Sequence, residues 1–450
     1  MSWERRVASV LLAGMGVALG SALMFMLIHD RLSAWSRVDP RSTPAADVAV
    51  FFIERSGWKR FLDGLAVATS PERSAGSIVL ASDDVVIAET SPNRRRVRFS
   101  WENARGRAET IESVRRLLSS PTPPIAIIGS SNTLLTNALA ETTAVASPRR
   151  APMLLVPWAT SMPLLERHRG GVVRFCANNQ TVADDLVAGL ATHRPLPQRV
   201  VIVVDPRDPY SLDLADCFER AVAAAAPSAR VERRGDLLAR PSSGRSDLGA
   251  SAPSIEEQEF AREVRITAAT TPTWLFLPIQ GEPIRRLFAA LNGAAPPRSE
   301  RRGLIVVCGD GIGPAAFESF VNALTFPIWA PAGLSVTDRR GDLGTSGDSQ
   351  VLAEIAAAVL AVVDDLDPID HEAFRERLSS LKISASDPRS MGRPIAFTSA
   401  GERARESSED LIVLEPGSSE VSYLARDGLG IWGEPRPIPG RAAIGDRRTP

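Results

Sequence analysis

Short runs of apolar, often β-branched residues alternate with longer stretches of helical periodicity along most of the chain. Runs such as Met153–Val156 have the length of buried strands, while stretches such as Ser211–Ala225 repeat apolar residues at helical spacing. Strands that take turns with helices are typical of a parallel sheet wrapped by helices, so the pattern predicts an α/β fold of doubly wound sheets. The expected strands are Val48–Ile53, Ile78–Leu80, Val97–Trp101, Ile125–Ile128, Met153–Val156, Val172–Phe175, Val200–Val204, Trp274–Leu277 and Leu304–Val307. The expected helices include Ala108–Leu118, Val182–Thr192, Ser211–Ala225, Ile255–Ile266, Pro283–Leu291 and Gln350–Val363.

Polar residues follow four of these apolar runs directly. The segments are IAIIGSSN (125–132), LLVPWATS (154–161), VVIVVDPRDPY (200–210) and LIVVCGDG (304–311). Open α/β sheets bind their ligands beyond the carboxyl ends of the strands, where backbone N–H groups and helix N-termini point. Serine, threonine and asparagine are also favoured as ordinary helix caps, so each segment alone fits either a ligand site or a cap.

An uncharged run, Val7–Ile28, lies close to the N-terminus. As a helix that rises about 1.5 Å per residue, it would be long enough to cross a bilayer core of about 30 Å. Arg5 and Arg6 precede it, which predicts a cytoplasmic N-terminus with the rest of the chain outside. The alternative is a cleaved signal peptide, but the apolar run continues past the small residues at Ala18–Gly20, which favours the membrane anchor.

Size and composition narrow the function classes. At 450 residues the chain exceeds one ordinary core, so two or more folded units are expected. A net charge of −1 supplies no basic footprint, which makes nucleic acid an unlikely partner. Cys176, Cys217 and Cys308 cannot all pair within the chain and lack the spacing of metal ligands; Cys308 lies in an apolar strand and is expected in the core.

Motifs of common enzyme classes are absent from the sequence. It contains neither the G-x-S-x-G motif of hydrolases nor H-E-x-x-H, and neither Lys59 nor Lys382 follows a glycine-rich phosphate loop. The segment GDGIGP (309–314) matches the letters of a motif in isopropylmalate-type dehydrogenases, but it lies late in the chain and lacks that family's lysine and aspartate clusters. We therefore expect no catalytic residues, no metal site and no cofactor.

The order of these segments resembles the type I periplasmic binding protein family, specifically its leucine/isoleucine/valine-binding branch of ABC transporter substrate-binding proteins. Three further stretches match: GVVRFCANNQ (171–180), the hairpin-like GRPIAFTSAGER (392–403) and the final strand LIVLEPG (411–417). The resemblance covers about residues 47–425.

This resemblance implies two α/β lobes joined by three crossing segments, with a ligand held between them. The implied divisions are a transmembrane anchor at 7–28, a linker at 29–46, lobe 1 at 47–171 plus 332–388, lobe 2 at 172–331 plus 389–428, and a disordered tail at 429–450.

The resemblance also implies how an amino acid would be bound. In the family, hydroxyl and backbone groups of one lobe grip the ligand carboxylate, while a tyrosine and an acid of the other lobe engage its ammonium. The corresponding positions are Ser130, Ser131, Ala159 and Thr160 for the carboxylate, and Tyr210 and Asp310 for the ammonium. Trp158 and Trp329 are candidates to line the pocket, although tryptophan in such folds also serves in packing.

Three hypotheses follow. The first is a membrane-tethered, extracytoplasmic solute-binding protein that holds an amino acid or similar small polar ligand for ABC-type transport or sensing, with a membrane permease or sensor as partner. In a variant of it, the protein is secreted after signal cleavage. The second is an interaction scaffold that kept the fold without a ligand, and the third is an enzyme on a doubly wound sheet.

Overall fold

The computed structural model describes residues 46–437 except 74, 104, 131, 148, 239–251, 295–302, 310–323, 332–346, 391–393, 405–410, 417–421 and 426–431. The predicted anchor at 7–28 and the linker before residue 46 lie outside these residues. Within the described ranges, none of the helices combines the length and apolar character that crossing a membrane requires.

The first sheet has seven strands in the order β2-β3-β4-β1-β5-β6-β7. The strands from β4 to β7 run parallel, whereas β2 and β3 form an antiparallel extension at one edge. Its members are β1 (Ala46–Phe51), β2 (Gly76–Ala81), β3 (Val85–Thr90), β4 (Arg96–Glu102), β5 (Ala126–Ile128), β6 (Met153–Val156) and β7 (Val172–Arg174).

The second sheet has eight strands in the order β17-β16-β15-β12-β11-β10-β8-β9. It is parallel from β12 to β9 and antiparallel from β15 to β17. Its members are β8 (Arg199–Val203), β9 (Arg230–Arg234), β10 (Thr273–Leu277), β11 (Leu304–Cys308), β12 (Ile328–Pro331), β15 (Leu411–Leu414), β16 (Ser422–Leu424) and β17 (Arg436–Pro437). A separate pair joins β13 (Lys382–Ile383) and β14 (Ile395–Ala396).

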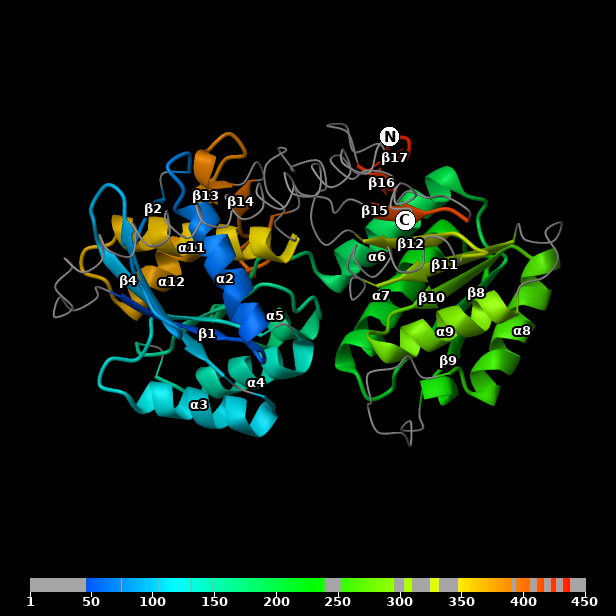
Figure 1. Cartoon of the computed structure of the whole chain (residues 1–450), viewed down its shortest axis with the longest axis horizontal. Helices are drawn as coiled ribbons and strands as arrows, with labels where there is room; N and C mark the ends of the chain where they lie inside the picture. The colour runs from blue at the N-terminus through cyan, green and yellow to red at the C-terminus, as the bar shows by residue number, and fades with distance from the viewer. Residues whose placement is uncertain are drawn as a thin grey trace, which may run out of the picture.

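Helices cover both faces of each sheet, so each sheet has its own core (Figure 1). On the first sheet, α2 and α11 pack on one face and α3, α4 and α5 on the other. On the second, α8 and α9 cover one face and α6 and α7 the other. The bounds are α2 (Arg55–Ala68), α3 (Arg107–Ser119), α4 (Thr133–Ala144), α5 (Pro163–Arg167), α6 (Asn179–His193), α7 (Pro209–Ala225), α8 (Ile255–Thr270), α9 (Glu282–Gly293), α11 (Gly347–Asp365) and α12 (His371–Ser379), with short 3₁₀ turns at Asp236–Leu238 and Pro388–Ser390.

The chain passes from one sheet to the other slightly later than expected. The predicted boundary at 171/172 assigns β7 to the second lobe, but β7 pairs with β6 in the first sheet. Ile395, also assigned to the second lobe, is fully buried in the core of the first. Both segments stay with the first sheet because their apolar side chains complete its core.

Part of the predicted disordered tail is ordered. Trp432 is buried against the core under α6 and α7, and β17 pairs with β16 as the edge of the second sheet. The segment assigned to the tail at 429–450 therefore includes an edge strand and a buried tryptophan, whose large aromatic ring stabilises the chain at 432–437.

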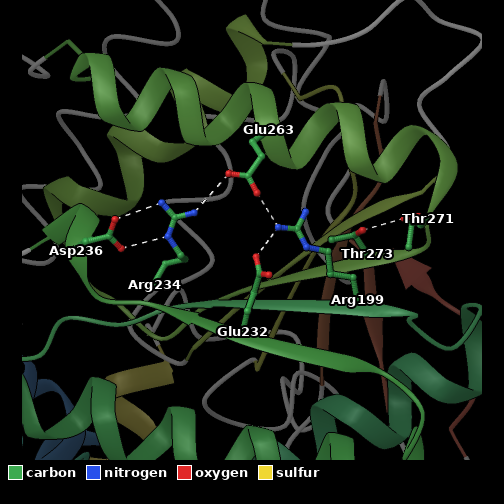
Figure 2. A network of polar contacts seen from close by, with 7 residues as sticks. All are labelled: Arg199, Glu232, Arg234, Asp236, Glu263, Thr271 and Thr273. Atoms are coloured by element: carbon green, nitrogen blue, oxygen red, sulfur yellow. Dashed lines mark hydrogen bonds and ion pairs between the residues drawn. The ribbon is translucent and has the colours of Figure 1, made fainter.

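Strand β9 is the charged edge of the second sheet, and its sequence, RVERR, did not predict a strand. Arg199 on β8 pairs with both Glu232 on β9 and Glu263 on α8, while Arg234 pairs with Asp236 and again with Glu263 (Figure 2). Charged side chains on an edge strand discourage pairing with other chains, which accounts for this composition.

Candidate functional site

Two hydroxyl side chains of the predicted site lie at the carboxyl edge of the first sheet. Ser130 follows β5 and Thr160 follows β6, and these strands are parallel neighbours with Ile128 opposite Leu155. The Gly129 N–H donates to the Leu155 carbonyl at 2.8 Å, which extends the pairing beyond the strand ends. The fold therefore brings both residues to the same edge, as the sequence predicts.

Ser130 lies beside the N-terminus of α4. Asn132 caps this helix, its side-chain oxygen accepting the Leu135 N–H at 2.8 Å. The asparagine of the segment is thus a helix cap, whereas Ser130, only 2% exposed, accepts a long 3.4 Å bond from the Asn132 N–H. Because the first N–H groups of a helix carry partial positive charge, this corner favours an anion. Ser131 lies outside the described residues.

Thr160 presents a buried hydroxyl that lacks a hydrogen-bond partner among the described residues. Its side chain is 2% exposed, and its carbonyl accepts the Asn179 N–H at 2.8 Å, which fixes the backbone. An unsatisfied buried hydroxyl costs about 1–3 kcal/mol, so such groups are rare unless another molecule satisfies them. Ala159 is fully buried in the core beneath α4 and α5 and acts there in packing.

Tyr210 lies at the carboxyl end of the second sheet. Asp208 caps α7 by accepting the Tyr210 N–H at 3.0 Å, which places the tyrosine in the first turn of the helix. A Cβ added to Gly309, directly after β11, would lie 2.4 Å from the Tyr210 hydroxyl oxygen, so the ring packs against the start of the GDG loop. Asp310 is outside the described residues.

Asp213 connects the two halves of the molecule and was not singled out from the sequence. From α7 it accepts the Met162 N–H at 2.9 Å and the Asn179 side-chain amide at 2.6 Å. Burial raises the pKa of Asp213, while these two donors and the nearby Arg174 cation oppose that rise. In the sequence, the only feature that could have pointed to Asp213 is its place three residues after Tyr210, on the same face of the same helix. An acid at such a position is more often solvated.

Buried ion pairs tie the crossing segments together. Arg174, fully buried at the end of β7, contacts both carboxylate oxygens of Glu402 at 3.0 and 3.2 Å and donates to the Ser161 carbonyl. Arg403, which follows Glu402 in the chain, pairs with the buried Glu354 of α11 at 2.5 Å. Each pair joins segments that are far apart in the sequence. Because Arg174 also donates to the Ser161 carbonyl, its ion pair with Glu402 fixes the loop that carries Thr160.

The two candidate tryptophans differ in environment. Trp329 is 1% exposed within the second sheet's core, and its role is packing. Trp158, two residues before Thr160, is half-buried at the edge of the first sheet. Its ring lies 5.7 Å from that of Phe52, and the Arg60 guanidinium lies 5.9 Å from its centroid. Only Trp158 belongs to the edge that carries the hydroxyls.

No family model and no curated protein sequence matches the chain. Solved structures do match it over most of its length. An ABC transporter substrate-binding protein from Desulfitobacterium hafniense in complex with Leu is 13% identical, with 84% of this chain and 99% of that one covered at a TM-score of 0.60. A leucine-binding protein from Thermotoga maritima is 15% identical, with 84% and 98% covered at 0.57. The chain has the type I periplasmic-binding-protein fold.

A third solved structure with this fold holds a ligand that is not an amino acid. A solute-binding protein of an ABC transporter from Rhodopseudomonas palustris, in complex with 4-hydroxybenzoate, is 11% identical, with 87% of this chain and 96% of that one covered at a TM-score of 0.54. The family expected from the sequence is thereby confirmed at the level of the type I fold. At such low identity the ligand must be argued from the chain's own residues.

Proposed function

We propose that this protein is an extracytoplasmic solute-binding protein that holds a small carboxylate-bearing ligand between two lobes. The observation that carries the proposal is the buried, unpartnered hydroxyl of Thr160, beside Ser130 at the carboxyl edge of the first sheet. Hydroxyl groups and helix-start N–H groups stabilise a carboxylate by charge-assisted hydrogen bonds. The matching solute-binding proteins hold Leu or 4-hydroxybenzoate, both of which carry a carboxylate.

The lobes of the proposal follow the two sheets. Lobe 1 comprises roughly 46–174 with 347–397, and lobe 2 roughly 175–331 with 411–437. A ligand gripped by Thr160 from one lobe and by groups near Tyr210 from the other would favour the closed form, because it binds that form more tightly. Ligand binding would thereby become a movement that a membrane partner can detect.

Membrane tethering is the second part of the proposal. The uncharged run at 7–28 would anchor the protein with its folded part outside the cytoplasm, next to a permease or a sensor. Either a permease or a sensor would recognise the closed form of the protein. Transport and sensing differ in the partner, while the binding site is the same.

A thermal-shift assay tests the proposal on the full chain. Amino acids and small organic acids are added singly, and at least one should raise the melting temperature, because a ligand bound only by the native state stabilises it. In Thr160→Val the shift should shrink, since the donor is lost. Thr142→Val is the matched control, because Thr142 is also buried but bonds the Ala138 carbonyl within α4.

Two outcomes would contradict this function. One is the absence of a shift with every compound of the panel, and the other is an equal shift in the wild type and in Thr160→Val. For α-amino acids, Asp310→Ala should abolish the shift if that acid takes the ammonium group. A shift that survives this change would assign the ammonium to another group.

A further inference from the structure

We propose that Asp213 is a positioning residue of the ligand site. From lobe 2 it holds the segment 160–162 of lobe 1 in place, so that the Thr160 hydroxyl keeps a fixed arrangement with the helix that carries Tyr210. This inference rests on the proposed function and adds to it the contact through which one lobe controls the binding group of the other.

The Thr160 hydroxyl depends on the backbone for its position. Within the part of the chain that the structure describes, this hydroxyl makes no hydrogen bond of its own that could direct it. The backbone around it is instead fixed by successive bonds. The Thr160 carbonyl accepts the Asn179 N–H at 2.8 Å, and the Ser161 carbonyl accepts from the Arg174 guanidinium. Whatever fixes this short segment therefore also fixes the hydroxyl.

The next bond along the segment belongs to Asp213. Its carboxylate accepts the Met162 N–H at 2.9 Å and the Asn179 side-chain amide at 2.6 Å, and both bonds end on the same oxygen, Oδ2. That oxygen joins the end of the segment to the first residue of α6, whose own N–H holds Thr160. An ionised acceptor makes stronger hydrogen bonds than a neutral one, which suits a carboxylate to this junction.

The bonds of Asp213 cross from one lobe to the other. Asp213 lies in α7 and Asn179 in α6, and both helices cover the second sheet. Met162 directly precedes α5, which packs on the first sheet, yet its side chain packs against the core under α6 and α7. Tyr210 lies three residues before Asp213, so the two residues share a face of α7. One helix thus carries a candidate ligand group of lobe 2 and the acceptor that holds the lobe 1 segment.

Hydrogen exchange of the full chain, followed by mass spectrometry, tests this contact without any ligand. In Asp213→Ala the Met162 N–H loses its acceptor, so peptides that cover 160–165 should exchange about tenfold faster, because the segment opens more easily. Asp213→Asn keeps an oxygen at the same place and should show a smaller increase. Unchanged exchange of this segment in Asp213→Ala would overturn the proposal.

Asp364→Ala is the matched control. Asp364 is buried, and it also accepts from a side chain and from the backbone: from the Thr90 hydroxyl and, at 2.9 Å, from the Asn93 N–H. Thr90 ends β3 beside the start of β4, at the edge of the first sheet opposite to Thr160. This variant should destabilise the protein but leave the exchange of 160–165 unchanged. Equal effects of both variants on that segment would show a general loosening and would overturn the role of Asp213.

Isothermal titration calorimetry tests the consequence for binding. The probes are leucine and 4-hydroxybenzoate, the ligands held by two of the matching solute-binding proteins. For a probe that binds the wild type, Asp213→Ala should raise the dissociation constant by about tenfold, Asp213→Asn should raise it less, and Asp364→Ala should leave it unchanged. An unchanged dissociation constant in Asp213→Ala would contradict the positioning role.

The two experiments separate this inference from the proposed function. If neither probe binds the wild type while the exchange of 160–165 responds as expected, the failure lies with the proposed function, and the contact between the lobes stands. If a probe binds but neither its affinity nor the exchange depends on Asp213, solute binding stands and the inference fails.

Discussion

Removal of the Glu402 carboxylate should destabilise the protein far more than removal of a comparable surface carboxylate. Glu402 contacts Arg174, whose side chain is fully buried where the chain leaves the first sheet. In Glu402→Ala this cation would stay in the interior without its ion-pair partner, with only the more distant Asp213 carboxylate near it. Breaking a buried pair on one side costs about 3–5 kcal/mol, because the remaining charge is desolvated and uncompensated.

An exposed pair of the same residue types provides the control. Arg107 and Glu141 lie 2.7 Å apart, but their side chains are 53% and 48% exposed. Water screens such a pair, so Glu141→Ala should cost about 0–1 kcal/mol. The expected contrast therefore comes from burial, since the N–O distance in the exposed pair is even shorter than the 3.0 Å between Arg174 and Glu402.

Thermal unfolding of both variants measures the difference. About 1 kcal/mol corresponds to roughly 2–4 °C for a domain of this size class, so Glu402→Ala should lower the melting temperature on the order of 10 °C. The double variant Arg174→Met/Glu402→Ala should recover part of the loss, because the buried charge is gone. A melting temperature for Glu402→Ala equal to that of Glu141→Ala would refute the reasoning.

Two further predictions concern local packing and pH. Gly309→Ala should lower the free energy of unfolding by about 1–3 kcal/mol, because its Cβ would lie 2.4 Å from the Tyr210 hydroxyl oxygen; Gly293→Ala, where nothing lies within 4 Å, should be neutral or stabilising in the same denaturant titration. Equal midpoints for the two variants would contradict this packing. Burial lowers the pKa of His371 below its ordinary 6.5, so its contribution to stability is present above that pH and is lost as the pH falls through the folded-state pKa. Between about pH 7 and about pH 5, the melting temperature of His371→Gln should therefore fall less than that of the wild type, and parallel pH curves would exclude this role.

The sequence predicted the parallel core of both sheets because those strands are buried on both faces. Met153–Val156 was expected and is observed with the same bounds, and all four side chains are buried. Such continuous apolar runs, bounded by turn residues, need no tertiary information to be recognised. The hairpin-like segment at 392–403 was also predicted, and Phe397 pairs with Arg403 in an antiparallel bridge there.

Elements that depend on distant partners could not be predicted. The helix α2 contains Gly64, which breaks an apolar pattern; a Cβ there would lie 2.7 Å from the Ser349 carbonyl of α11, so the glycine permits close helix packing. In β9, Arg233 pairs with acids of α7 and Arg234 pairs with Glu263 of α8. Neither partner can be identified from local sequence.

The candidate site likewise contains some residues that the sequence identifies and others that it does not. Ser130, Thr160 and Tyr210 could be singled out as candidates because each follows a predicted strand, where ligands of open sheets bind. Asp213 and Glu402 were missed, because their importance comes from contacts between segments that only the folded chain brings together. An acid on a helix or in a hairpin carries no sequence signal that distinguishes such a role from solvation.

Native mass spectrometry of the full chain tests most directly whether a small molecule is held at the edge that carries Thr160. We expect one bound carboxylate per chain, either co-purified or after incubation with the panel, and a clearly reduced bound fraction in Thr160→Val. A wild-type chain that retains none of these compounds, or equal occupancy in the wild type and the variant, would contradict it.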